Sequence, residues 1–171
     1  MLGQLSDENI DWMIAKGKRE HVPAGTVLIE EGKASELVYI VLDGSLGVFV
    51  QASGTDQQIA ERGVGEILGE MSFIDDRPPT ATVKAAEEST LFTIPKALLS
   101  QKLEDDRDFA ARFYRGIAIS LSYRLRESME QSGPGTSPSG ETDEDELDSN
   151  VLDSAYLAGM RFDRIVRRMM G

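Results

Sequence analysis

The feature that most constrains the fold is a series of short strand-like segments between residues 18 and 94. Each is rich in β-branched and aromatic residues, and glycines such as Gly44, Gly54 and Gly65 separate them. Short strands at regular spacing with glycine turns are typical of a barrel or a jelly roll. The segments are GTVLIEE, ELVYIVLDG, SLGVFVQ, QQIAER, TATVKA and TLFTI.

One segment, from Leu37 to Leu42, is apolar at every position. A strand with one wet face alternates between apolar and polar residues, whereas a strand buried on both faces reads as a continuous apolar run. We therefore expect this strand to be covered on both sides.

Helical patterns flank the strand region. A short entry helix is expected over residues 5–17, with Ser6 and Asp7 as caps, and a second from Pro95 to about Leu103. The longest helix is expected over 104–131. Acids at its start lie at the positive end of the helix dipole, where they stabilise it. These acids are Glu104, Asp105, Asp106 and Asp108.

The long helix carries an apolar stripe at four-residue steps, formed by Phe109, Phe113, Ile117, Leu121 and Leu125. Either the stripe packs only on its own barrel, or part of it pairs with the same helix of a second subunit. The stripe has more apolar surface than one barrel face needs. We expect a homodimer through residues 104–130.

The chain divides into three parts. Residues 1–130 form the main domain, and residues 131–150, rich in Gly, Ser, Pro and acids, are expected to be a disordered acidic linker. Residues 151–171 are expected to form an amphipathic helix, with four arginines mostly off its stripe. We expect this helix to pack on the protein itself, with a partner protein or a membrane surface as alternatives. Its stripe comprises Leu152, Ala155, Gly159, Phe162, Val166 and Met169.

Composition excludes several classes of protein. The net charge of -12 disfavours contact with phosphate backbones. The chain has no cysteine and a single histidine, His21, so neither a thiolate nor a histidine-rich metal site is expected, and a cupin-type enzyme is excluded. No long apolar run or secretory signal is present, which predicts a cytoplasmic protein.

The segment GEILGEMSFIDDRPPTATVKA, from Gly65 to Ala85, has the pattern of an anion pocket. A short helix starts at Gly69–Ser72, and Thr80 with Ala81 opens the next strand. Free amides at a helix start favour an anion, and a carboxylate can accept hydrogen bonds from hydroxyl groups.

Together with VPAGTVLIEEGKASELVYIVLDGSLGV, this segment resembles the cyclic nucleotide-binding domain of catabolite activator proteins, cyclic-nucleotide-dependent kinases and gated channels. The resemblance covers about residues 5–130. It implies a mainly β fold with added helices. An eight-stranded jelly roll, or double-stranded β-helix, would carry an N-terminal helix, a phosphate-binding cassette helix and C-terminal B and C helices.

The resemblance also implies a ligand site. Glu70 would accept a hydrogen bond from the ribose 2'-hydroxyl, and the amides of Met71 and Ala81 and the hydroxyl of Thr80 would lie nearest the nucleotide. Gly69 and Ser72 belong to the same turn. On the C helix, Ser128 lies near the position from which the family offers a hydroxyl to the base, although a serine late in an amphipathic helix usually faces solvent.

One position departs from the family pattern. The arginine that neutralises the cyclic phosphate is replaced by Pro79, which has neither a guanidinium nor an N–H. Arg77 could reach the phosphate from the preceding turn, or pair with Asp75 or Asp76 on the surface. Loss of a charged hydrogen bond lowers affinity by roughly 10 to 150-fold.

The sequence therefore predicts a standalone regulatory or sensor module and no enzyme. Its ligand would be cyclic AMP or another cyclic nucleotide, bound weakly or with altered specificity, and no cofactor is expected. The alternative is a degenerate domain that binds no nucleotide and acts as a protein–protein interaction module. Too few residues follow Glu130 for a winged helix-turn-helix, so direct DNA binding is not expected.

Overall fold

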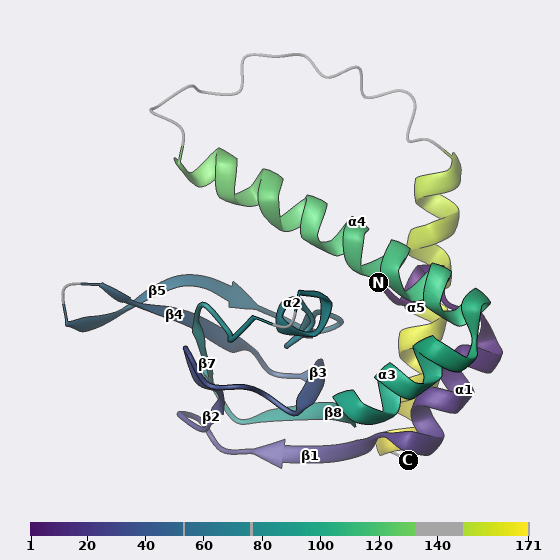
Figure 1. Cartoon of the computed structure of the whole chain (residues 1–171), viewed down its shortest axis with the longest axis horizontal. Coiled ribbons are helices and arrows are strands. Elements are labelled where there is room, and N and C mark those ends of the chain that lie inside the picture. Colours follow the sequence, from purple (N-terminus) through teal and green to yellow (C-terminus); the bar gives the residue numbers. More distant parts are fainter. Residues whose placement is uncertain (53, 76, 133–148, 171) are drawn as a thin grey trace.

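The computed structural model describes residues 1–52, 54–75, 77–132 and 149–170 (Figure 1). In chain order the elements are η1 (Leu2–Gln4), α1 (Asp7–Lys16), β1 (Lys18–Val22), β2 (Val27–Ile29), β3 (Leu37–Asp43), β4 (Leu46–Ala52), β5 (Thr55–Arg62), β6 (Ile67–Leu68), α2 (Met71–Ile74), β7 (Thr82–Ala85), β8 (Ser89–Pro95), α3 (Lys96–Asp105), α4 (Arg107–Ser132) and α5 (Ser149–Met170).

The strands form two antiparallel four-stranded sheets, ordered β1-β8-β3-β6 and β2-β7-β4-β5. This confirms the jelly roll with added helices. The predicted segments did not include β1 and β6, because β1 is largely polar and β6 has only two residues. His21 lies exposed on the edge strand β1, where its Nε2 is 3.1 Å from Glu88 Oε1.

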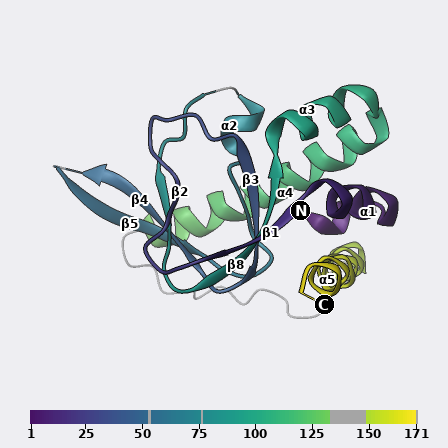
Figure 2. The same ribbon diagram turned by 90° about the horizontal axis from the view of Figure 1, so that it is seen from below.

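Strand β3 is buried on both faces, as its apolar run predicted. Tyr39 and Val41 point into the barrel, where they pack with residues of both sheets. Val38, Ile40 and Leu42 point the other way, into a second core formed with the helices. Helices α1, α3 and α5 lie together beside the barrel, and α4 runs from them across it (Figure 2).

The boundary between α3 and α4 differs from the expected one. Asp106 has an extended backbone and ends α3, and its carboxylate accepts a hydrogen bond of 2.9 Å from the Phe109 amide at the start of α4. Glu104 and Asp105 therefore close α3 instead of opening α4. Pro95 is likewise the residue before α3 and not its first turn.

The apolar stripe of α4 packs mainly within the chain. Phe109, Phe113 and Ile117 are fully buried in the helical core, so they are unavailable to a second subunit. Leu125, by contrast, is 58% exposed. The homodimer stays a prediction, but Phe109, Phe113 and Ile117 cannot form its interface.

Helix α5 packs on the N-terminal elements, which confirms the expectation that it docks on its own protein. Ile165, absent from the predicted stripe, is fully buried, and Phe162, Val166 and Met169 are partly buried against the same core. Gly159 is exposed, so the inward face is rotated from the predicted one. The side chain of Leu152 and most of the predicted linker, 133–148, lie outside the described residues.

Polar contacts reinforce this docking. A Cβ on Gly3 would lie 2.3 Å from the Ser154 carbonyl oxygen, so η1 approaches α5 as closely as a glycine allows. Arg161 Nη1 donates to the Gly3 carbonyl at 2.7 Å, and Arg164 Nη1 lies 3.3 Å from Asp7 Oδ2. The acidic main domain thus attracts the arginines, as expected. No described helix is long and apolar enough to cross a membrane.

We predict slow amide exchange over residues 155–168 in the isolated protein, because the helix is docked. Ile165→Ala should remove about 2 to 5 kcal/mol of docking free energy and make this exchange fast, while the barrel stays protected. Hydrogen exchange with mass spectrometry measures both. The control is Leu157→Ala, since Leu157 is 38% exposed on the same helix. Coil-like exchange in the unmodified chain would contradict the docking.

Candidate functional site

The turn from β6 into α2 positions the central carboxylate. Gly69 has φ +85°, and a Cβ there would lie 2.8 Å from the Leu37 carbonyl oxygen. Only glycine combines this conformation with so close an approach. The turn places Glu70 directly before α2 with only 2% of the residue exposed.

The buried Glu70 carboxylate is paired with Arg124, which comes from the C-terminal half of α4. Arg124 Nη1 donates to Glu70 Oε1, and Nη2 donates to the Ile67 carbonyl. The Arg124 side chain is 18% exposed. A carboxylate this buried needs a charged partner, and the chain itself supplies one.

Further ion pairs surround Arg124. Its Nε is buried without a hydrogen bond and lies 3.8 Å from Glu66 Oε1. Arg62 Nη1 donates to Glu127 Oε2 at 2.8 Å and also approaches Glu66. The hydrogen bond and the charge of Arg62 lower the pKa of Glu127. These pairs fasten α4 to the end of β5 and to the start of β6.

Lys96, the first residue of α3, adds a second cation near Glu70. Burial lowers the pKa of Lys96, while the Glu70 carboxylate acts in the opposite direction. Two cationic side chains, Arg124 and Lys96, therefore act on the Glu70 carboxylate.

The other residues predicted for the cassette, the segment from Gly65 to Ala85, lie on α2 and just before β7. Met71 is 55% exposed on α2, and the Ser72 side chain lies outside the described residues. Thr80 is exposed and Ala81 half-buried just before β7. The Pro79 carbonyl accepts a hydrogen bond of 2.8 Å from Gly32 N, which joins this stretch to the loop after β2.

Two predicted ligand residues are placed away from Glu70. Arg77 has its side chain 82% exposed, with Nε 3.8 Å from Asp75 Oδ2, which is the surface role weighed above. Ser128 is exposed on α4, one turn beyond Arg124. The residue that α4 brings to the cassette is therefore Arg124 and not Ser128.

Sequence reasoning missed Arg124 and Lys96. A usable signal existed for Arg124, because it follows Leu121 by three residues and so shares its helix face. After Leu121 the inward face of α4 continues with Arg124, and Leu125 lies outside. The predicted stripe, which took every fourth residue, included Leu125 instead. Lys96 carries no such signal, since only the fold brings it near Glu70.

The site offers hydrogen-bond acceptors and cations but no metal centre. No group of three or more His, Cys, Asp or Glu among the described residues could hold a metal ion. Glu70 Oε1 already accepts from Arg124, so a ligand hydroxyl at this oxygen would share it with Arg124 or displace it.

Two curated relatives show where this domain occurs. The chain is 30% identical over 112 residues to the cAMP-dependent protein kinase regulatory subunit of Blastocladiella emersonii, covering 65% of this chain and 28% of that protein. It is also 30% identical over 129 residues to Lysophospholipase NTE1 of Cryptococcus neoformans, covering 75% of this chain and 8% of that enzyme. The chain spans a small part of both relatives, so the match concerns one domain.

A solved structure confirms the architecture. A cyclic nucleotide-binding domain from Methylobacillus flagellatus superposes with a TM-score of 0.70 at 24% identity, covering 77% of this chain and 76% of that one. The cyclic nucleotide-binding domain profile matches residues 19–106, just over half of the chain. This domain is a regulatory module and not a catalytic one. With the jelly roll, the cassette turn and this match together, the chain belongs to the cyclic nucleotide-binding domain family.

Proposed function

We propose that this domain binds a cyclic nucleotide weakly at the cassette and that the ligand competes with Arg124 for Glu70. The observation that carries the proposal is the buried ion pair between these two residues. A ribose hydroxyl would donate to the carboxylate that Arg124 now holds. Where the hydroxyl displaces Arg124 from this oxygen, binding replaces a charged partner by a neutral one, which weakens it.

The phosphate side of the site also favours weak binding. Pro79 stands where the family pattern has the phosphate-pairing arginine, and Arg77 is on the surface beside Asp75. Backbone amides near Met71 and Ala81 remain as donors. One lost charged hydrogen bond accounts for roughly 10 to 150-fold in affinity.

The Glu70–Arg124 pair also offers a way to couple ligand binding to movement of α4. Arg124 ties the C-terminal half of α4 to the cassette, and Arg62 with Glu127 strengthens the tie. A ligand that displaces Arg124 releases this part of α4 and shifts the population toward an undocked helix. The domain would thereby convert binding into helix movement.

A second candidate is a degenerate domain that binds no nucleotide and contacts a partner protein. It is favoured by the completeness of the Glu70–Arg124 pair, which leaves the buried carboxylate with a partner when no ligand is present. Calorimetry separates the two candidates, because only the first gives saturable heat with a cyclic nucleotide.

We predict strong energetic coupling between Glu70 and Arg124. Arg124→Gln should lower the free energy of unfolding by about 3 kcal/mol, because it leaves a buried carboxylate unpaired. The double variant with Glu70→Gln should lose less than the sum of the single losses. Urea unfolding measures all three. Arg126→Gln, an exposed change two residues later, should stay within about 0.5 kcal/mol. Additive losses would contradict a direct pair.

We predict that cyclic AMP and cyclic GMP bind the unmodified chain weakly in isothermal titration calorimetry. Pro79→Arg should tighten binding by about 10-fold or more, because it restores a phosphate-pairing guanidinium. Arg77→Lys, a change on the exposed loop, is the control and should have little effect. Tight binding by the unmodified chain that changes neither with Pro79→Arg nor with Arg77→Lys would refute the role assigned to Pro79.

We also propose a homodimer on the outward face of α4. Tyr114, Leu125 and Met129 are exposed there at 44%, 58% and 64%, and their spacing suits a second copy of the helix. Light scattering at tens of micromolar should give about twice 18.8 kDa. Leu125→Glu should return the chain to a monomer, whereas Ala15→Glu on α1 should not. A monomeric unmodified chain would reject this interface.

A further inference from the structure

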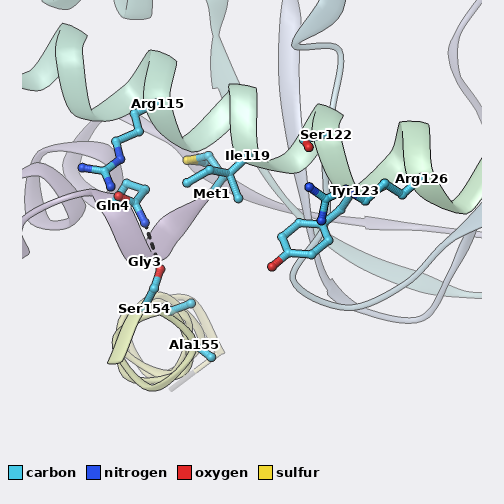
Figure 3. Close-up of a pocket in the computed structure, with 11 residues that line it drawn as sticks. Met1, Gly3, Gln4, Arg115, Ile119, Ser122, Tyr123, Arg126, Ser154 and Ala155 are labelled. Carbon is cyan, nitrogen blue, oxygen red and sulfur yellow. Dashed lines mark hydrogen bonds between the residues drawn. The ribbon is translucent and has the colours of Figure 1, made fainter. Parts of the chain in front are cut away.

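We propose that the hollow between α4 and α5 is a second ligand site, which binds an organic anion with an apolar body. It lies where the two helices diverge from η1 and has a volume of about 460 Å³ (Figure 3). Sites for small organic ligands fall in the range of roughly 300 to 1,000 Å³. Glu70, Thr80 and Ala81 do not line it, so the proposal is independent of nucleotide binding at the cassette.

Two arginines supply the charge. Arg115 and Arg126 line the hollow and form no hydrogen bond or ion pair with any described residue. Eleven residues separate them, about three helical turns, so both project from the same face of α4. Figure 3 shows the side chain of Arg126 running back along the helix beside the Tyr123 ring, toward the Arg115 end.

These two guanidinium groups differ from four nearby arginines that are paired with acids. Arg62 and Arg124 are paired with acids between α4 and the sheet, and Arg161 and Arg164 with acids of α1. In a chain of net charge -12, acidic partners are plentiful. Two guanidiniums on one hollow that no described residue pairs therefore mark a place where a further anion would be attracted.

Apolar and aromatic groups lie between the two charges. Ile119 and Tyr123 come from α4, and Ala155 and Ala158 from α5, whose small side chains leave the space open. Tyr123 is 58% exposed, so its ring offers a stacking surface that the described residues leave uncovered.

The end of the hollow nearest the N-terminus is held in place. Gln4 Nε2 donates to Ser154 Oγ at 2.8 Å, and this hydrogen bond joins η1 to α5 (Figure 3). The walls are thus set before any ligand arrives, which lowers the entropic cost of binding. A flat or chain-like body with a sulfonate, phosphate or carboxylate group matches a cationic rim around an apolar floor.

The test is an amide-resolved NMR titration of the full chain with three probes. They are a naphthalene sulfonate, the uncharged naphthalene methanol, and inorganic sulfate. The sulfonate should shift the amide signals of Ile119, Tyr123 and Ala158 saturably. The other two should bind at least about 10-fold more weakly, because each lacks either the charge or the apolar body.

Variants then locate the site. Arg115→Gln with Arg126→Gln should weaken sulfonate binding by about 10-fold or more. Arg112→Gln, the same charge change on an exposed part of α4 outside the hollow, should not. Ala155→Trp should abolish binding by filling the space without altering charge, whereas Ala15→Trp on α1 should not. Unresponsive signals around the hollow, or equal losses in test and control variants, would overturn the proposal.

Discussion

The architecture depends on the burial of β3 and β8 on both faces. Ile40 and Phe92 face the helices, while Val41 and Leu91 face the inside of the barrel. A sheet with apolar residues on its outer face must be covered, and here α1, α3, α4 and α5 contribute to the cover. This requirement places the long helix α4 on the side of the barrel where the cassette begins, and there Arg124 can contact Glu70.

The contact between α4 and the cassette is polar, in contrast to the rest of the helical core. A buried carboxylate and a largely buried guanidinium cost desolvation energy, which their mutual attraction and the hydrogen bond to the Ile67 carbonyl offset. Such a pair stabilises less than apolar packing would, but it can be exchanged for another donor. A polar contact between the proposed ligand site and a helix therefore suits regulation better than a purely apolar one.

Helix α5 is connected to the N-terminal half of α4 through the first residues of the chain. It packs on η1, which in turn packs on α4, and a Cβ on Gly116 of α4 would lie 2.8 Å from the Met1 carbonyl oxygen. The N-terminal residues are therefore held between two helices far apart in sequence. Helices α4 and α5 diverge beyond these N-terminal residues, and their divergence creates the hollow bounded by Arg115 and Arg126.

The sequence alone predicted the jelly roll, the double burial of the Leu37 to Leu42 run, the cassette turn at Gly69 and Glu70, and the docking of an amphipathic tail. The strands, the double burial and the amphipathic tail follow from local conformation and apolar periodicity, which neighbouring residues encode. The choice of a jelly roll and the cassette turn rested also on the resemblance to the family. Only the tertiary structure decided that Arg124 pairs with Glu70, that Lys96 lies near it, and that Ile165 is the buried centre of α5. Periodicity defines a helix face to within about one residue. Which residue on that face meets a given carboxylate is settled by how whole elements pack.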